Sequence, residues 1–424
     1  MKYSGKKLLI LGSNVGSIDM IDYARKNGAY TIVADYLPKE QSEAKQHSDS
    51  YIMLSTADVD GLCDYVVGNH IDGVIAGISE FNLLQAMKVC QRCGLPFYCS
   101  KEQWDCIEDK GQFRSLCLKY DVPCPQTYYI GKNPADCKDY CFPIVVKPVD
   151  ASSSIGVTIC ETEEVYRKAV VLAAESSKSG TVIIEEFFEG DEFTAHYSIA
   201  DGVPTLVSVD NRYPVKINEG AVTSIPIARV YPSSFLEEYK RQINDNLIEL
   251  CTSLKLEVGV FFVQGLYNKV LNKFCIFEAG LRSAGESPNR FMERVNGVNF
   301  LHNLVDFSLL GKLQSYDVTK EDPELKGKRC AVISYVAKGG KIAEIVGYSN
   351  IRDVVSSIVD SECRYHVGDI VPSGNTLRQI VLRFILVCDS IEQLRNAVNT
   401  INERVSVIGT NGKEMCLKFD PSLL

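Results

Sequence analysis

Residues 142–194 carry the two motifs from which the rest of the chain can be interpreted, FPIVVKPVDASSSIGVTIC at 142–160 and TVIIEEFFEGDEFT at 181–194. In the first motif, β-branched residues predict a strand, a polar turn and a second strand. Lys147 ends the first strand, where its ammonium group can reach a phosphate. The turn offers backbone N–H groups and hydroxyls that can surround phosphate oxygens, from Ser152, Ser153, Ser154 and Gly156.

The second motif is an apolar strand that breaks into acidic and aromatic residues. Glu185 and Glu192 lie on either side of Phe187 and Phe188. A carboxylate can accept hydrogen bonds from an exocyclic amine or from ribose hydroxyls. The two motifs therefore predict a nucleotide site, although the same spacing also fits an ordinary hairpin, helix and strand with acidic residues on the surface.

The paired motifs resemble the ATP-grasp superfamily, which includes D-alanine–D-alanine ligase, biotin carboxylase and the purine-pathway carboxylate–amine ligases. The resemblance extends over nearly the whole chain, as in the three-domain members that are similar to biotin carboxylase or L-amino-acid ligase. It implies ATP and Mg²⁺ as cofactors. It also implies that Lys110 and Lys147 contact the α- and β-phosphates, with Ser152 to Gly156 as the phosphate loop.

The resemblance implies roles for the second motif as well. Glu185 would face the adenine N6, and Glu192 would take the ribose hydroxyls. Backbone groups near Phe187 and Phe188 would contact the edge of the ring.

Length and composition fit a large protein with two to four domains, because 424 residues can form several cores. The formal net charge of −9 disfavours a nucleic-acid partner. The sequence contains no apolar run near 18 residues, so we expect no membrane span. The sixteen cysteines are scattered through apolar segments, which predicts small buried side chains in the reducing cytoplasm.

Residues 1–100 alternate between strand-like and helix-like segments, which predicts βαβ units and a Rossmann-like parallel sheet. Gly12 and Gly16 form part of a dinucleotide fingerprint, and Asp35 ends the second strand, so a dehydrogenase is one alternative. Cys90 and Cys93 are a second alternative site, for a metal or redox chemistry, but no second ligand pair stands at suitable spacing.

Residues 101–312 resemble the two-lobed ATP-grasp domain, with the lid subdomain at about 120–188. The segment DKGQFR at 109–114 matches the usual Lys-x-x-x-Arg of the family's lead-in helix. A helix is expected at about 234–255, followed by a hairpin of apolar strands within 258–287. Arg229, in the preceding loop, is expected to reach the mouth of the site.

The hairpin departs from the family pattern at the residues that would bind magnesium. Members usually carry an acid on the first strand and Glu-x-Asn-x-Arg after the second strand. Here these positions are Gln264 and then Glu278, Gly280 and Arg282. Mg²⁺ prefers oxygen ligands and keeps several waters, so Glu278 and the Gln264 amide oxygen remain a metal-binding pair. A second metal ion stays an open question.

Arg282 and its surroundings are the expected acceptor-substrate site. A guanidinium group can clamp a transferred phosphoryl group or a carboxylate through two hydrogen bonds, so Arg282 and Lys147 are the predicted catalytic residues. The resemblance implies that the loop containing Ser283 and Arg290 contacts the acceptor. Glu80 is a further expected contact, although an acid at a helix N-terminus is also stabilised by the helix dipole.

Residues 313–328 contain Pro323 and Gly327 and are the predicted linker. Residues 329–424 predict a small C-terminal α+β domain of antiparallel strands with one long helix. The fold class is therefore α/β and α+β, in three domains.

Taken together, the sequence predicts an ATP-dependent ligase. A substrate carboxylate would be activated as an acyl phosphate and attacked by an amine, and ADP and phosphate would be released. The expected partners are small-molecule carboxylates and amines, with a homodimer possible by analogy with the family. The alternative is a nucleotide-binding homologue with weakened catalysis and a regulatory or scaffolding role.

Overall fold

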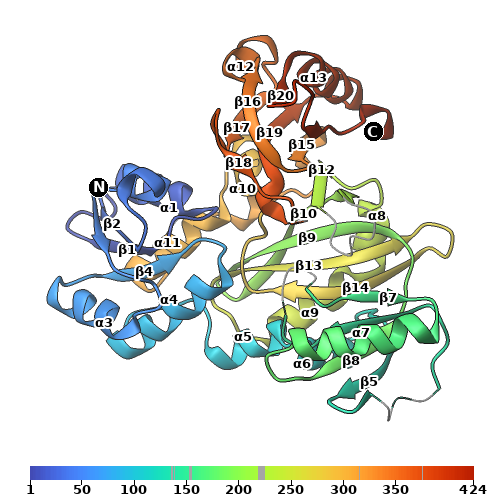
Figure 1. Ribbon diagram of the computed structural model, residues 1–424. Helices are drawn as coiled ribbons and strands as arrows, with labels where there is room; N and C mark the ends of the chain where they lie inside the picture. The colour runs from blue at the N-terminus through green and yellow to red at the C-terminus, as the bar shows by residue number, and fades with distance from the viewer. Residues whose placement is uncertain (135–136, 138, 152–154, 218–224, 315, 375) are drawn as a thin grey trace.

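A four-stranded parallel sheet with the order β3-β2-β1-β4 forms the N-terminal part of the computed structural model (Figure 1). The structure describes residues 1–424 except 135–136, 138, 152–154, 218–224, 315 and 375. The strands are β1 (Lys7–Leu11), β2 (Tyr30–Asp35), β3 (Ser50–Met53) and β4 (Gly73–Ala76). The helices of this part are α1 (Ser17–Lys26), α2 (Glu43–His47), α3 (Val59–Gly68) and α4 (Glu80–Cys93). The predicted parallel sheet is confirmed.

Two helices lead from this sheet to a small antiparallel lobe, drawn in cyan and green in Figure 1. They are α5 (Lys101–Glu108), which Ser100 and Gln103 cap in a capping box, and α6 (Lys110–Lys119), which Asp109 caps. The small lobe has the strand order β5-β8-β6-β7 and contains the helix α7. Its elements are β5 (Thr127–Gly131), β6 (Ile144–Pro148), β7 (Thr158–Cys160), α7 (Glu163–Ser176) and β8 (Val182–Glu186).

A second antiparallel sheet, β10-β9-β13-β14, lies above the small lobe in Figure 1. Its strands are β9 (Asp191–Ala200), β10 (Val203–Val209), β13 (Gly259–Asn268) and β14 (Lys273–Gly280). The helix expected at about 234–255 is divided into α8 (Leu236–Tyr239), a π-helical turn at Lys240–Asn244 and α9 (Asp245–Ser253). Helices α10 (Asn289–Asn296) and α11 (Phe300–Leu310) follow.

The C-terminal part contains a sheet with the order β11-β12-β15-β19-β17. Its strands are β11 (Asn211–Val215), β12 (Ile225–Tyr231), β15 (Arg329–Ala337), β17 (Ile358–Cys363) and β19 (Ile380–Cys388). Strands β11 and β12 fall in the range expected for the ATP-grasp domain, yet β12 pairs with β15 from Ala228 to Tyr231. These two strands therefore tie the ATP-grasp range to the C-terminal sheet.

Smaller elements complete the C-terminal part. A short sheet is formed by β16 (Gly340–Val346), β18 (Ile370–Val371) and β20 (Ser406–Gly409), and β21 (Cys416–Leu417) pairs with β15. The helices are α12 (Ile351–Val354) and α13 (Ile391–Arg404), the latter being the predicted long helix. The 3-10 turns at Val318–Lys320 and Leu325–Gly327 lie in the expected linker.

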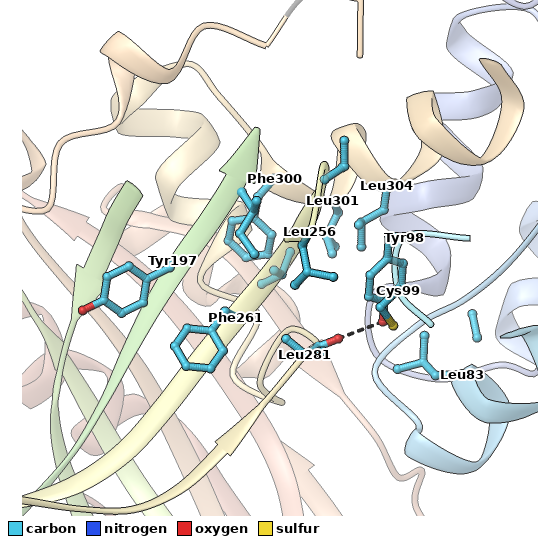
Figure 2. Packing of buried hydrophobic residues seen from close by; sticks show 14 of the residues in the cluster. Leu83, Tyr98, Cys99, Tyr197, Leu256, Phe261, Leu281, Phe300, Leu301 and Leu304 are labelled. Atoms are coloured by element: carbon cyan, nitrogen blue, oxygen red, sulfur yellow. Dashed lines mark hydrogen bonds between the residues drawn. The ribbon is translucent and has the colours of Figure 1, made fainter. Parts of the chain in front are cut away.

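The buried apolar residues that the structure describes form three clusters, and one of these clusters extends over two of the predicted domains. The N-terminal sheet and the larger ATP-grasp sheet share one cluster, while the small lobe and the C-terminal sheet each have their own. Figure 2 shows part of the shared cluster, which contains Leu83 and Tyr98 of the N-terminal part together with Phe261 and Phe300. The Tyr98 hydroxyl donates to the Leu281 carbonyl at 2.8 Å. The N-terminal part is thereby fixed next to the end of β14.

Candidate functional site

A cavity of about 1020 Å³ lies between the small lobe and the larger sheet. Both sheets contribute to its walls, with strands β6 and β8 on one side and β14 on the other. It brings together seven of the predicted nucleotide and metal residues: Lys110, Lys147, Glu185, Phe187, Phe188, Glu192 and Glu278. The volume and the mixed apolar and charged lining suit a nucleotide-sized ligand.

The predicted phosphate loop can be placed only in part. Ser152, Ser153 and Ser154 lie outside the described residues. Gly156 follows them with φ +72°, in the left-handed region, and a Cβ atom there would lie 2.7 Å from Cβ of Ser176. Glycine is therefore needed at the turn that leads into β7.

Lys147 and Glu185 form an ion pair on the face of the small lobe that lines the cavity, with Nζ and Oε2 2.5 Å apart. The Arg114 Nε donates to the other carboxylate oxygen at 2.9 Å. All three side chains are buried. Burial by itself would raise the pKa of Glu185, but Lys147 and then Arg114 outweigh it and hold that pKa below its usual value. The carboxylate is therefore ionised.

Arg114 connects the two lobes, and it was not among the predicted site residues. Its guanidinium donates to the carbonyls of Ile276 and Phe277 on β14, each at 3.1 Å, as well as to Glu185 on β8. The Lys-x-x-x-Arg spacing in the lead-in helix was the sequence signal for this residue. One side chain thus sets the position of the small lobe relative to the larger sheet.

Lys110 and Glu192 both line the cavity, and each has a partner from a different segment of the chain. The Lys110 Nζ donates to the Ala151 carbonyl at 2.9 Å, so it holds the chain that follows β6. Glu192 forms an ion pair with Arg212 of β11. Arg212 was not expected at the site, and no sequence motif marks it. The β9–β10 hairpin pairs Val209 with Ala195, and this register carries the start of β11 alongside Glu192.

Gln264 and Glu278 are directly opposite each other in the antiparallel pair β13–β14, so their side chains share one face. Glu278 lines the cavity. One carboxylate and one amide oxygen, together with phosphate oxygens of a nucleotide, fit the oxygen ligands that Mg²⁺ prefers. Among the described residues, no group of three or more His, Cys, Asp or Glu side chains is arranged to hold a metal ion.

Arg282 and Glu80 meet although 201 residues separate them in the chain, since Arg282 Nη2 lies 2.7 Å from Glu80 Oε1. The guanidinium also lies over the ring of Phe262, with its Cζ atom 5.0 Å from the ring centroid, and donates to the Ser283 carbonyl at 3.2 Å. Glu80 and Glu278 line a second cavity of about 250 Å³, next to the first. Lys110, Ala151 and Glu278 line both cavities.

Glu108 lines the second cavity as well and was not among the predicted residues. Burial raises the pKa of Glu108 to about 8; the negative charges of Glu80 and Glu278 add to this, while Arg282 and Lys110 oppose it. No sequence signal marks Glu108, because an acid at a helix end resembles an ordinary surface residue.

Arg229 belongs to a separate buried cluster rather than to the lining of either cavity. It forms an ion pair with Asp210 at 2.6 Å and approaches Glu286 at 3.4 Å. The buried ring of His196 lies 3.5 Å from Glu286. Burial lowers the pKa of His196 to about 3, with Asp210 acting in the opposite sense, so at pH 7 this histidine is neutral.

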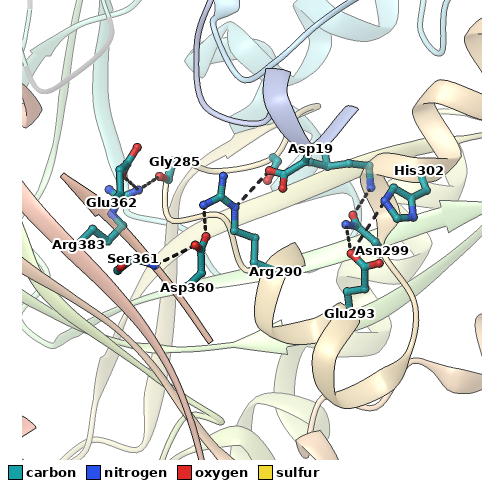
Figure 3. A network of polar contacts seen from close by, with 12 residues as sticks. Asp19, Gly285, Arg290, Glu293, Asn299, His302, Asp360, Ser361, Glu362 and Arg383 are labelled. Carbon is teal, nitrogen blue, oxygen red and sulfur yellow. Dashed lines mark hydrogen bonds and ion pairs between the residues drawn. The ribbon is translucent and has the colours of Figure 1, made fainter. Parts of the chain in front are cut away.

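Arg290 forms a polar junction between the N-terminal and C-terminal parts, which Figure 3 shows. From α10 it reaches Asp19 of α1, with Nε and Oδ2 3.3 Å apart, and it also contacts Asp360 of β17. Ser283, which is buried, donates to the Ala284 carbonyl at 3.3 Å. Of the expected acceptor contacts, Glu80 and Arg282 pair with each other beside the second cavity, whereas Arg290 lies at the junction between the N-terminal and C-terminal parts.

Asp35 belongs to the alternative dinucleotide site, and Cys90 and Cys93 to the alternative metal or redox site. Asp35 accepts hydrogen bonds from the Leu37 amide at 2.9 Å and from the Ser42 hydroxyl at 3.3 Å, so its carboxylate organises the turn after β2. Cys90 is buried in α4 and Cys93 is partly buried, and both are free thiols.

None of the helices within the described ranges has the length and apolar character needed to span a bilayer.

The comparisons with known proteins agree with this architecture. Residues 132–213 match the family model described as D-ala D-ala ligase C-terminus. The L-amino acid ligase of Bacillus licheniformis superposes with a TM-score of 0.78 at 17% identity, covering 96% of this chain and 100% of that chain. The phosphoribosylglycinamide synthetase of Anaerococcus prevotii gives 0.74 at 17% identity, with the same coverage.

A curated relative extends the agreement to the sequence level. The carbamoyl phosphate synthase large chain of Caldanaerobacter subterraneus is 22% identical over 307 residues, which cover 66% of this chain and 28% of that protein. The chain thus spans about a quarter of the length of the first curated relatives it matches.

Fold and cavity together give the architecture called ATP-grasp, in which two sheets enclose a nucleotide-sized cavity. The chain has this fold, and the recognition made from its two motifs is confirmed.

Proposed function

We propose that the protein is an ATP-dependent ligase that joins a carboxylate to an amine. The observation that carries the proposal is the cavity between the two lobes, which collects Lys110, Lys147 and Glu278 from three separate segments. Two cations and one carboxylate at the end of a nucleotide-sized cavity suit a triphosphate with a divalent ion. The ATP-grasp fold and the ligases that share it support the same activity.

Two steps account for the reaction. A carboxylate oxygen of the first substrate attacks the γ-phosphorus, the bond from that phosphorus to the β–γ bridging oxygen breaks, and ADP leaves. The amine nitrogen then attacks the acyl carbon of the acyl phosphate, the carbon–oxygen bond to the phosphate breaks, and the amine gives up a proton. The products are an amide, ADP and phosphate.

The side chains of the site act by position and charge rather than by covalent chemistry. Lys110 and Lys147 would bind phosphate oxygens, and Arg282 would bind the transferred phosphoryl group or the carboxylate. Gln264 and Glu278 would hold Mg²⁺, which neutralises charge on the phosphates. A biotin carboxylase domain from Hydrogenobacter thermophilus with this fold was solved with MgADP, which supports this assignment.

The test is an ADP-release assay on the full chain with ATP, Mg²⁺ and a panel of carboxylates and amines. A ligase requires one carboxylate and one amine together for full ADP release, and the amide appears in equal amount by mass spectrometry. If ATP binds but no pair of substrates releases ADP, the nucleotide-binding alternative replaces the ligase. Lys147→Ala is the matched inactive variant, and Lys168→Ala, on the exposed face of α7, is the control.

A further inference from the structure

The face of the β13–β14 hairpin next to the N-terminal part holds a carboxylate oxygen without a partner. Glu108 is the last residue of α5, and its Oε1 atom is buried and accepts no hydrogen bond from any residue that the structure describes. A Cβ atom built on Gly280 of β14 would lie 3.1 Å from this oxygen. The Phe262 ring, 2.5 Å from the same position, and this Glu108 oxygen together occupy the space that a side chain at position 280 would need.

Glu108 shares this face with the two residues that would hold the metal ion. Gly280 and Glu278 are two residues apart on β14, so they face the same side of the sheet, about 7 Å apart. Gln264 is directly opposite Glu278 on β13. Both Glu108 and Glu278 line the 250 Å³ cavity, and Glu278 continues into the wall of the larger cavity. Two carboxylates thus line one cavity, from a helix and a strand, and Gln264, which is in the lining of neither cavity, stands opposite Glu278 on the neighbouring strand.

The neighbouring cations have other partners, although the buried Nε of Arg282 has none among the described residues. Arg282 pairs with Glu80 at 2.7 Å, and Lys110 donates to the Ala151 carbonyl at 2.9 Å. Within the described part of the chain, Glu108 has no ion pair within 4.0 Å, while the carboxylates of Glu80 and Glu278 add negative charge nearby. A buried polar group without a partner is costly, and a bound cation would remove that cost.

We propose that Glu108 is a second carboxylate ligand for the divalent cation that Glu278 and Gln264 would hold. The donor that position 280 lacks is then supplied from the end of α5. Two carboxylates with an amide and phosphate oxygens match the ligand set of Mg²⁺ in phosphoryl-transfer sites. The inference rests on the proposed function, since the phosphates of a bound nucleotide complete the coordination.

The experiment uses the full chain, ADP and Mn²⁺ as the metal probe. Free Mn²⁺ is measured by electron paramagnetic resonance during a titration at saturating ADP, for the wild type and for Glu108→Gln, which is nearly the same size. The expected result is about 10–100-fold weaker binding of Mn²⁺ by the variant. Glu102→Gln, on the exposed side of the same helix, is the matched control and should titrate like the wild type.

A thermal unfolding scan without metal shows whether the variant is folded, and because the Oε1 atom of Glu108 has no hydrogen bond to lose, the midpoint should stay close to that of the wild type. Unchanged Mn²⁺ binding by Glu108→Gln would overturn the inference while leaving the proposed function intact. An equal loss in Glu102→Gln would also overturn it, because the effect would then come from overall charge. If the wild type binds no Mn²⁺ with ADP, the proposed function fails together with the inference.

Discussion

Lys147 is the residue at which the nucleotide proposal can be tested most simply. Its ammonium group lines the cavity and is paired with Glu185. A charged hydrogen bond to a phosphate is worth about 1.5–3 kcal/mol, so Lys147→Ala should weaken ATP binding by about 10–100-fold. Isothermal titration calorimetry with ATP checks this, with Lys168→Ala as the control. Equal affinity in Lys147→Ala and the wild type would place the phosphates elsewhere.

His196 gives the fold a predictable dependence on pH. Its pKa is about 3 in the folded protein, against about 6.5 when unfolded, so below pH 6.5 the unfolded chain binds more protons. Stability therefore falls as the pH drops below 6.5 and is flat above that value. Between pH 7 and pH 5 this residue should cost about 2 kcal/mol.

Urea denaturation at both pH values measures the difference, and the variant His196→Gln should show a smaller loss on acidification than the wild type. A loss of the same size in the variant would show that other groups set the acid sensitivity.

At the scale of elements, Arg114 makes α6 the connection between the small lobe and β14. Replacing it by leucine leaves the buried Glu185 with one cation instead of two and removes two hydrogen bonds to β14. Breaking a buried ion pair costs about 3–5 kcal/mol. Chemical denaturation of Arg114→Leu should show a loss of this order.

Lys119→Met, on the exposed end of the same helix, provides the comparison and should change stability by less than about 1 kcal/mol. A small effect of Arg114→Leu would mean that packing alone fixes the small lobe.

The elements also show which features the sequence could predict. The alternation of strands and helices in residues 1–100 and the hairpin around Gln264 depend on local periodicity, which the sequence displays directly. The pairing of β12 with β15 joins residues about 100 positions apart, and no local pattern encodes it. Glu108 was missed for the same reason, because Glu278 and Arg282 beside it come from a distant segment. The π-helical turn at Lys240–Asn244 likewise leaves the apolar spacing of the helix almost unchanged.

At the scale of the whole molecule, Arg290 connects the N-terminal and C-terminal parts through Asp19 and Asp360 (Figure 3). Arg290→Met would leave both carboxylates without their cation, so stability should fall by about 1–3 kcal/mol. Affinity for ATP should stay the same, because Arg290 does not line the nucleotide cavity. A higher KM for the acceptor substrate would support the predicted substrate contact of Arg290, whereas lower ATP affinity would contradict this separation of roles.

The three hydrophobic clusters explain how the cavity is built. The N-terminal part and the larger sheet share one core, so Glu80, Arg282 and Glu278 are carried by one packed body. The small lobe has its own core and contributes Lys147 and Glu185. Motif residues could be predicted because they are contiguous in sequence, whereas this division of the core depends on which faces pack together in three dimensions.

A crystal structure of the protein with Mg²⁺ and a non-hydrolysable ATP analogue would show whether the cavity between the two lobes binds ATP. We expect the triphosphate between Lys110 and Lys147, the ribose near Glu192, and the metal ion against Glu278. An analogue bound outside the cavity between the two lobes, or a cavity without density at a saturating concentration of the analogue, would contradict this expectation.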